Sequence, residues 1–481
     1  MTHINPLEMV SFFSTRTIQD LYEEIRQTYR ANDFPWVIGY SGGKDSTATV
    51  QAIWYALSEM KKEDWKKPIF VISSDTLVET PVVIDQINST LHLISSKAKE
   101  QGLPIQVEKV TPKIEDTFWV NLIGKGYPAP SKRFRWCTER MKIKPANTFI
   151  VEQAARFGEV VMVLGARKSE GMSRAQVLSN QSRQIAGTRL RRHSSLSRAY
   201  TYTPVEDFST DDIWSYLLQV PSPWGSSNRD LAALYRRTES GECPLVVDTS
   251  TPSCGNSRFG CWVCTVVEKD KTMQTLIDTG EEWMEPLLDF RDILKDTQTP
   301  EKKLIYREFK RRDGQVIVKD DKFIPGPYKP EFRIQFLKEI LNLQVKLRDD
   351  GPNSNITLIT SEELFEIRKI WKKELPDLGD PIPYLYFEIV GENLDWVHDE
   401  TGSISGEELE IIKEICEKNS VPMRLVTKLI ETEKRMEGMG RRSGIFDEIG
   451  SIFQEEWADK DEILERVLSD KEYQLKLGIE S

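Results

Sequence analysis

An apolar run followed by a glycine-rich turn constrains this 481-residue chain more than any other feature. The run occupies residues 36–40 (WVIGY), residues 41–46 (SGGKDS) follow it, and a mainly apolar stretch of helical character comes next. A strand that ends in two glycines and reopens as a helix points several main-chain N–H groups at one spot, where the helix dipole also favours an anion. The pattern therefore predicts a strand, loop and helix that together bind phosphate.

The loop departs from the Walker sequence, which has Gly five positions before its second glycine and Ser or Thr directly after its lysine. Ile38 and Asp45 stand at these positions, so a Walker NTPase is disfavoured. The loop instead resembles the PP-loop of ATP pyrophosphatases in all six positions. That resemblance implies that the β and γ phosphates of ATP are held together, so that ATP is cleaved between its α and β phosphates. The remaining alternative is an ordinary glycine-rich turn with a solvated Lys44.

Short apolar segments alternate with helical stretches over the first half of the chain. We expect strands at residues 36–40, 69–73, 105–110 and 160–164, preceded by a helical, amphipathic N-terminal segment in residues 1–35. Strands separated by helices predict an α/β fold with a doubly wound, mainly parallel sheet. Such sheets bind ligands at the carboxyl ends of their strands, near the point where the strand order reverses.

Four further motifs fall where that rule places ligands, or close to it. They are SSDT at residues 73–76, RFRWCTERMKIKP at 133–145, GARKSE at 165–170 and TPVEDFSTDDIW at 203–214. All four resemble motifs of the adenylylsulfate and phosphoadenylylsulfate (PAPS) reductase branch of the PP-loop superfamily. We therefore assign residues 36–235 to a PP-loop domain of PAPS reductase-like type.

The charge of the chain is unevenly distributed. The formal net charge is −11, which argues against a nucleic-acid partner. Residues 132–198, however, carry 15 Lys or Arg against 4 Glu, and phosphate-rich ligands follow the local potential. The candidates for contact with nucleic-acid phosphate are Arg133, Arg135, Arg140, Arg189, Arg191 and Arg192. For the last three, a solvated loop is the alternative.

Four of the six cysteines lie in one short segment, residues 236–268. Cys243, Cys254, Cys261 and Cys264 have the spacing C-x10-C-x6-C-x2-C. Four thiolates suit either a structural zinc or an iron–sulfur cluster. Zinc ribbons usually show two C-x2-C pairs, and this segment has one, so we favour a 4Fe-4S cluster. In a second interpretation Cys137 replaces Cys243 as a ligand.

Cys137 stands in a different environment from those four. Basic residues surround it in the sequence, and positive charge lowers the pKa of a thiol and favours the reactive thiolate. Cys137 is therefore a candidate nucleophile, with a small buried helix residue as the alternative. The sixth cysteine, Cys416, has the pattern of simple core packing.

An adenylylating loop, a candidate nucleophilic thiol and a four-cysteine segment together resemble the DndC-type sulfurtransferases of bacterial DNA phosphorothioation. The resemblance implies a non-bridging oxygen of the DNA backbone as the acceptor. It also implies a cysteine desulfurase as the sulfur donor and companion subunits of a DNA-modification complex. Three alternatives remain: a PAPS reductase, a tRNA thiolase, and a non-enzymatic iron–sulfur sensor of nucleic acid.

The resemblance also implies roles for individual residues. Lys44 would neutralise charge on the leaving pyrophosphate, Asp45 would organise Mg²⁺, and Cys137 would carry sulfur as a persulfide, with Lys142 beside it to hold acceptor phosphate. The residues that would bind ATP are Ser41, Gly42, Gly43, Lys44, Asp45, Ser46, Asp75 and Arg167.

Residues 269–481 change in composition to long charged helices interrupted by Pro and Gly. We expect a mainly helical region that contacts other proteins, covers the active face or has a purely structural role. No apolar run approaches the ~20 residues needed to span a bilayer, and residues 1–6 lack the features of a secretory signal. We therefore expect a cytoplasmic protein with no membrane partner.

Overall fold

The computed structural model describes residues 11–171, 175–176, 188–237, 260–319, 322–396, 404, 406–436, 444–458, 460–466 and 469. The chain divides into two compact units. The first comprises Met1–Lys113 and Pro130–Arg291, and the second comprises Ile114–Ala129 and Asp292–Ser481. Within the described residues, no helix is both long and apolar enough to cross a membrane.

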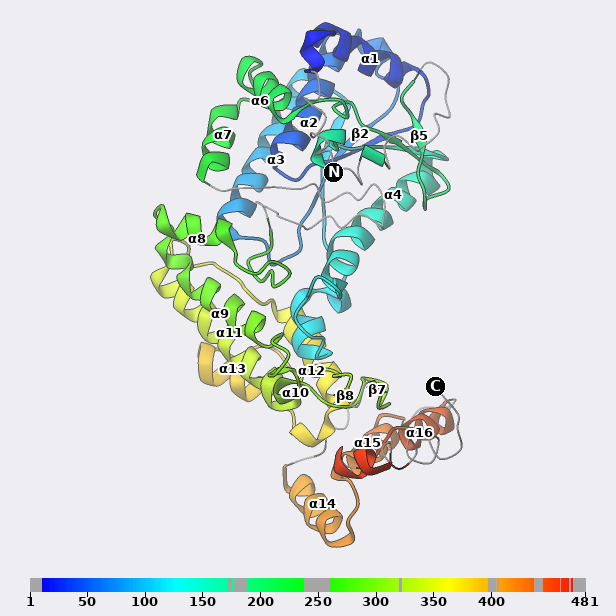
Figure 1. Cartoon of the computed structure of the whole chain (residues 1–481), viewed down its shortest axis with the longest axis vertical. Helices are drawn as coiled ribbons and strands as arrows, with labels where there is room; N and C mark the ends of the chain where they lie inside the picture. The colour runs from blue at the N-terminus through cyan, green and yellow to red at the C-terminus, as the bar shows by residue number, and fades with distance from the viewer. Residues whose placement is uncertain are drawn as a thin grey trace, which may run out of the picture. The chain divides into compact units, whose positions relative to one another are not determined.

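The first unit is built on a six-stranded sheet in the order β3-β2-β1-β4-β6-β5. Figure 1 labels two of its strands, β2 and β5. Every neighbouring pair is parallel except β5 and β6, which are antiparallel. The predicted α/β fold with a doubly wound, mainly parallel sheet is therefore confirmed. The strands are β1 (Trp36–Gly39), β2 (Ile69–Ser74), β3 (Ile105–Val110), β4 (Val160–Val163), β5 (Arg191–Arg192) and β6 (Ala199–Tyr202).

Helices cover both faces of this sheet, and β1 and β4 are accordingly buried at every position. Figure 1 shows α4 on one side of the sheet and α1 and α2 on the other. The helices up to residue 296 are α1 (Ile18–Arg30), α2 (Lys44–Ser58), α3 (Pro81–Gln101), α4 (Lys144–Phe157), α6 (Thr210–Gln219), α7 (Asn228–Arg237), α8 (Lys271–Asp278) and α9 (Glu285–Asp296). Short 3-10 or π turns lie at Phe12–Ser14, Lys62–Asp64, Ile114–Asp116, Val120–Gly124, Thr138–Ile143, Lys168–Glu170 and Glu282–Met284.

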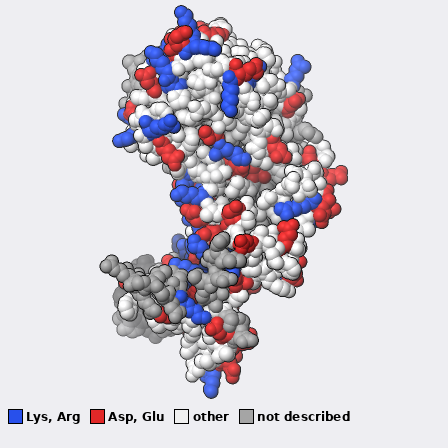
Figure 2. Space-filling view, turned by 180° about the vertical axis from the view of Figure 1, so that it is seen from behind, with Lys and Arg blue, Asp and Glu red and all other residues white. Residues whose placement is uncertain are grey.

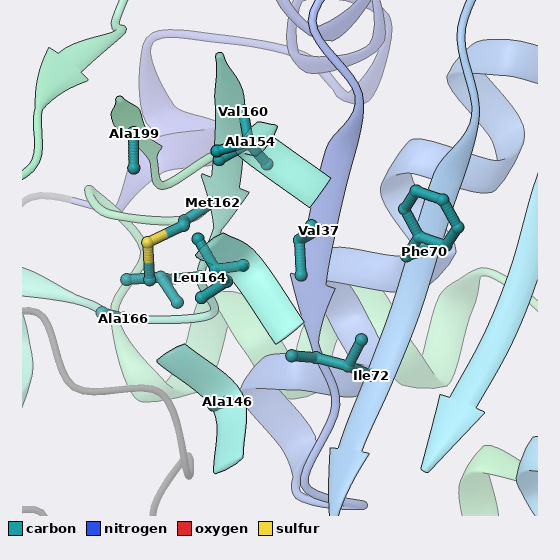
Figure 3. Close-up of a cluster of buried hydrophobic side chains, with 11 residues drawn as sticks. Val37, Phe70, Ile72, Ala146, Ala154, Val160, Met162, Leu164, Ala166 and Ala199 are labelled. Carbon is teal, nitrogen blue, oxygen red and sulfur yellow. The ribbon is translucent and has the colours of Figure 1, made fainter. Parts of the chain in front are cut away.

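A dry cluster of side chains joins the sheet to α4 (Figure 3). Val37, Ile72 and Met162 stand on three adjacent strands and face the helix, where Ala146 and Ala154 meet them. Because alanine adds little bulk, the helix can approach the sheet closely, and each large apolar side chain removed from water contributes roughly 1.5–3 kcal/mol. This packing fixes the strands whose ends carry the loops described below.

The strand order reverses between β1 and β4. The chain runs from β1 outward to β2 and β3 and then returns to the other side of β1 as β4, where Trp36 is in register with Val161. The loops that follow β1 and β4 therefore meet at one edge of the sheet. A Cβ atom on Gly165 would lie 2.7 Å from the carbonyl carbon of Asp45, so these loops touch through their main chains.

The second unit is helical, as predicted for the C-terminal region. Its helices and short strands are α10 (Lys303–Tyr306), β7 (Val318–Lys319), β8 (Lys322–Phe323), α11 (Pro330–Asp350), α12 (Ser361–Glu374), the 3-10 turn Pro376–Leu378, α13 (Ile382–Val390), α14 (Gly406–Asn419), α15 (Met423–Met436) and α16 (Ile445–Phe453). Residues 114–129 are inserted into it: Trp119 Nε1 donates to the Leu358 carbonyl at 2.6 Å, and Trp371 Nε1 donates to the Ile123 carbonyl at 3.0 Å.

Replacing Gly165 by alanine tests the contact between the two loops. The added methyl group must push the β4 loop away from the main chain of Asp45 and Ser46, and overpacking of this kind costs about 1–3 kcal/mol. We expect a lower Tm in a thermal unfolding experiment. Gly171→Ala is the matched control because nothing lies within 4 Å of its Cβ position. An unchanged Tm for Gly165→Ala would show that the loops do not touch.

Candidate functional site

The loop after β1 is shaped to present main-chain N–H groups at the start of α2. Gly42 has a left-handed φ of 73°, and Gly43 is the N-cap residue of α2 without a side-chain cap. The Ser46 hydroxyl braces the loop, because it donates to the Gly43 carbonyl at 3.0 Å and accepts the Ser41 N–H at 3.2 Å. Because the N-cap residue Gly43 has no side chain, α2 lacks the N-cap side-chain acceptor that helices commonly have.

One N–H of this loop already meets an oxygen from outside it. The main-chain N–H of Lys44 donates to the hydroxyl of Tyr235, on α7, at 2.9 Å. The Lys44 ammonium also lies 5.4 Å from the centre of the Tyr235 ring. This N–H can therefore donate to an oxygen atom from outside the loop, and a phosphate oxygen in its place stays a prediction. Nothing in the sequence around Tyr235 marks it for this position.

Two cations hold the Asp45 carboxylate. Lys44 Nζ lies 2.9 Å from Oδ2, and Arg167 Nε, from the β4 loop, lies 2.6 Å from Oδ1. All three side chains are at most 13% exposed, so water screens the pairs little. With Glu170, which also lies 3.8 Å from Arg167 Nε, the two cations are balanced by two carboxylates, so a polyanion bound here would compete with these carboxylates for Lys44 and Arg167. Both Asp45 oxygens are engaged, so a Mg²⁺ ion bound there would have to take one of them from its cation.

Arg167 connects the β4 loop to α6 as well. Its Nη1 donates to Ser169 Oγ at 2.6 Å and to Thr210 Oγ1 at 3.3 Å. Glu170 Oε1 lies 3.8 Å from Nε. Residues from the GARKSE and TPVEDFSTDDIW motifs therefore meet the PP-loop-like segment around one guanidinium group.

Asp75 lies at the same edge of the sheet, directly after β2. Its carboxylate accepts the Leu77 N–H at 2.8 Å and pairs with Lys109 at 2.8 Å. Leu77 has φ of 64°, which is unusual for a branched side chain and shows that Asp75 holds a tight turn. The role of Asp75 toward a nucleotide stays a prediction, and Lys109 is a partner that the sequence alone did not indicate.

A hollow of about 710 Å³ opens beside the glycine loop. Gly42 and Thr47 border it on one side, and Thr90 of α3 and Asn228 of α7 lie on the others. Its volume falls in the range of small-molecule sites, roughly 300–1,000 Å³. The glycine loop therefore borders a hollow that is large enough for a small molecule.

The C-x2-C segment is tied to the turn after β2. The Trp262 N–H donates to the Val78 carbonyl at 3.0 Å, and the Thr80 N–H donates to the Gly260 carbonyl at 3.4 Å. Cys261 Sγ lies 3.2 Å from Thr76 Oγ1 and 4.0 Å from Glu79 Oε1. Burial and then the charge of Glu79 raise the pKa of the Cys261 thiol well above its usual value.

Glu79 also reaches the segment that carries Cys137. Its Oε1 lies 3.8 Å from Lys142 Nζ, on the π-helical turn Thr138–Ile143 that begins directly after Cys137. The structure thus brings Lys142 and Cys261 to the same carboxylate. Glu79 was not among the candidate site residues, although its position shortly after the second strand was the available signal.

Two of the four cysteines predicted to bind a cluster lie within the described residues. Cys261 and Cys264 share one turn, with the Cys264 N–H donating to the Cys261 carbonyl at 3.0 Å, as a pair of ligands from C-x2-C requires. Cys243 and Cys254 lie outside the described residues. Within the described ranges no group of three or more His, Cys, Asp or Glu side chains is arranged to hold a metal ion. A C-x2-C pair occurs in structural zinc sites and in iron–sulfur clusters alike, so the 4Fe-4S cluster and its ligand set both stay predictions.

Carboxylates partner the arginines at and before β5. Arg191 is buried and donates to Glu206 at 2.6 Å, and Arg189 donates to Asp207 at 2.6 Å. Although burial raises the pKa of Glu206, the hydrogen bond from Arg191 and the charges of Arg191, Lys168 and Arg189 outweigh it and lower that pKa. Basic and acidic side chains are likewise intermingled over the upper part of Figure 2.

The other phosphate candidates are more accessible. Arg192 is 44% exposed and pairs with Glu159 at 2.9 Å. Arg133 is exposed, and Arg135 and Arg140 are half-buried. For all of these arginines a contact with nucleic-acid phosphate stays a prediction. Arg133 and Arg192 are more accessible than the other two because both are exposed.

Two family models match this chain. Residues 35–267 match the phosphoadenosine phosphosulfate reductase domain. Residues 407–454, which include most of α14 and all of α15 and α16, match a small protein found in certain Dnd DNA modification systems.

The similar proteins are distant. An uncharacterized protein of Methanocaldococcus jannaschii is 24% identical over 271 residues, which are 56% of this chain, and the chain covers 44% of that protein. PAPS reductase from Candida auris has a TM-score of 0.27 at 15% identity. The matched region is 44% of this chain and 84% of the reductase chain. The U34-tRNA thiolase NcsA from Methanococcus maripaludis, solved with its 4Fe-4S cluster, has a TM-score of 0.26 at 11% identity. The matched region is 46% of this chain and 72% of the thiolase chain. The family match at residues 35–267 covers the sheet and the glycine loop, so this region has a PAPS reductase-like fold.

Proposed function

We propose that this protein is an ATP-dependent sulfurtransferase that adenylylates a backbone phosphate oxygen of DNA and replaces that oxygen with sulfur. The observation that supports the proposal is the glycine loop at the switch point, where the Lys44 N–H donates to an oxygen from outside the loop and the side chains of Lys44 and Arg167 meet at Asp45. The Dnd-related segment at residues 407–454 supports a place among the subunits of a DNA-modification complex.

The first step activates the oxygen that is to be lost. A non-bridging oxygen of the DNA phosphate attacks the α phosphorus of ATP, and the bond from that phosphorus to the β-bridging oxygen breaks. The electron pair leaves with pyrophosphate, whose negative charge the loop N–H groups and Lys44 stabilise. Arg167 keeps Asp45 and the loop in place. AMP is now attached to the DNA phosphate as a good leaving group.

The second step brings in sulfur, which a cysteine desulfurase supplies as a persulfide on Cys137. The terminal sulfur attacks the DNA phosphorus and expels AMP, which leaves the phosphorus joined to Cys137 through two sulfur atoms. A thiol reductant then cleaves the sulfur–sulfur bond with two electrons, giving the phosphorothioate and the Cys137 thiol. Lys142 stands on the same turn, five residues beyond Cys137, and would hold the acceptor phosphate.

A 4Fe-4S cluster would be held by Cys243, Cys254, Cys261 and Cys264. When bound, it supplies electron transfer or fastens the segment around it. Thr76 and Glu79 contact Cys261, and Glu79 also lies near Lys142, which supports a cluster ligand close to the turn that follows Cys137.

PAPS reduction is the second candidate, because the family match of residues 35–267 is to a PAPS reductase domain. A reductase needs no ATP cleavage, so the two functions differ in one assay. Protein purified without oxygen and incubated with ATP and DNA should release pyrophosphate and AMP. Release of ADP and phosphate would exclude the pyrophosphatase reaction.

Lys44→Ala should abolish pyrophosphate release, because it removes the ammonium of the loop that is proposed to neutralise the leaving group. The assay measures pyrophosphate by an enzyme-coupled reaction, and we expect at least a 100-fold loss, about the effect of removing one transition-state contact. Lys97→Ala, on the exposed side of α3, is the control and should keep the activity of the unaltered chain. Equal activity of the two variants would contradict the assignment of Lys44.

Cys261→Ser should remove the iron, because a neutral hydroxyl replaces a thiolate ligand. Iron content and the visible absorbance of the purified protein report the outcome. Cys416→Ala alters a cysteine of α14 and serves as the control with full iron content. Unchanged iron in Cys261→Ser would refute the cluster assignment.

Cys137→Ser should leave pyrophosphate release intact and stop sulfur insertion, because serine cannot carry a persulfide. Nuclease digestion of cellular DNA followed by mass spectrometry detects phosphorothioate dinucleotides. We expect none in cells that carry this variant in place of the unaltered protein. Normal levels would rule out Cys137 as the sulfur carrier.

A further inference from the structure

A charged pocket of about 360 Å³ lies within the second unit, among residues that the proposed sulfur transfer does not use. Its walls are residues 308–314, the end of α12, and the facing sides of α15 and α16. The helices α15 and α16 belong to the segment that matches the small Dnd-system protein, so this segment supplies one side of the pocket. Seven Lys or Arg and five Glu side chains line it, which leaves a positive excess.

Three of the basic side chains are paired with a carboxylate from another part of the wall. Lys428 of α15 binds Glu455 at 2.7 Å, and the other two pairs are Lys373 with Glu448 at 3.5 Å and Arg312 with Glu374. These pairs join α12, α15, α16 and the 308–314 segment to one another. They set the shape of the pocket and cancel three positive and three negative charges.

Two further cations of the pocket are less well satisfied. Lys310 Nζ lies 5.4 Å and 5.5 Å from the ring centres of Phe309 and Trp457, and it has no carboxylate within ion-pair distance among the described residues. Arg424 reaches Glu308 only at 4.0 Å and the Glu374 carbonyl at 3.4 Å. Its Nε is buried and finds no hydrogen-bond acceptor in the described structure.

These two cations also repel one another. Burial first and then the charge of Arg424 lower the pKa of Lys310, while Glu308, Glu456 and Glu455 act in the opposite direction. The buried Arg333, whose guanidinium binds the carbonyls of Tyr328 and Gly124, adds a third positive charge to the lining. An anion between Lys310 and Arg424 would remove this repulsion and give Arg424 Nε an acceptor.

We propose that this pocket binds a phosphomonoester, the group carried by a nucleoside monophosphate or by the 5′ end of a DNA strand. A guanidinium and an ammonium are the side chains that best recognise a terminal phosphate with two charges. A volume of about 360 Å³ is large enough for one such group. The inference uses the second unit alone, so it holds whether or not the glycine loop of the first unit cleaves ATP.

Calorimetric titration of the full chain tests the proposal with four probes: inorganic phosphate, AMP, a short DNA strand with a 5′ phosphate, and the same strand with a 5′ hydroxyl. We expect binding of at least one phosphomonoester and weaker binding of the 5′-hydroxyl strand. Arg424→Gln and Lys310→Gln should each raise the Kd of the phosphomonoester that binds about tenfold, the loss expected for one charge-assisted hydrogen bond.

Lys369→Gln, an exposed position of α12, is the matched control and should leave the Kd unchanged. Thermal unfolding of each variant shows that it is folded. Since both variants lie in the second unit, a loss of affinity in them cannot come from the loop after β1. AMP binding alone indicates a free nucleotide, and preference for the phosphorylated strand indicates a DNA end. Failure of every phosphomonoester to bind, or equal Kd values in Arg424→Gln, Lys310→Gln and Lys369→Gln, overturns the proposal.

Discussion

The close contact between the loops that follow β1 and β4 is the constraint on which the candidate site depends. Gly165 allows the main chain of one loop to lie against Asp45 and Ser46 of the other. Because no side chain intervenes, Arg167 can reach Asp45 at 2.6 Å from the neighbouring strand. The cation, the carboxylate and the helix start are thereby fixed together before any ligand arrives, which is the preorganisation that charge stabilisation in a transition state needs.

A second group of contacts assembles around the turn after β2. Glu79 lies within 4.0 Å of Cys261 and of Lys142, although these residues come from segments far apart in the sequence. Cys261 and the turn that follows Cys137 therefore share a carboxylate. The turns after β1, β2 and β4 all lie at the carboxyl ends of parallel strands, so the sites proposed for ATP and for sulfur transfer share one edge of the sheet.

Much of this could be predicted from the sequence because local patterns encode it. The glycines of residues 41–46 specify a strand that turns into a helix, and alternating strands and helices specify a parallel sheet. Pairings between distant segments could not be predicted in this way. Arg189 and Arg191 form part of a basic stretch in the sequence, yet Glu206 and Asp207, 15 to 18 residues further along the chain, neutralise them in the structure. Likewise, nothing local indicates that residues 114–129 pack into the helical unit, because their tryptophan contacts lie more than 200 positions away.

The most direct test of the account is a crystal structure with an ATP analogue whose α and β phosphates are joined by a methylene group. The account predicts that the β and γ phosphates lie together at the main-chain N–H groups of residues 42–44, with Lys44 Nζ against them and the Tyr235 hydroxyl displaced. A nucleotide bound elsewhere, with the Lys44 N–H still donating to Tyr235, would contradict it.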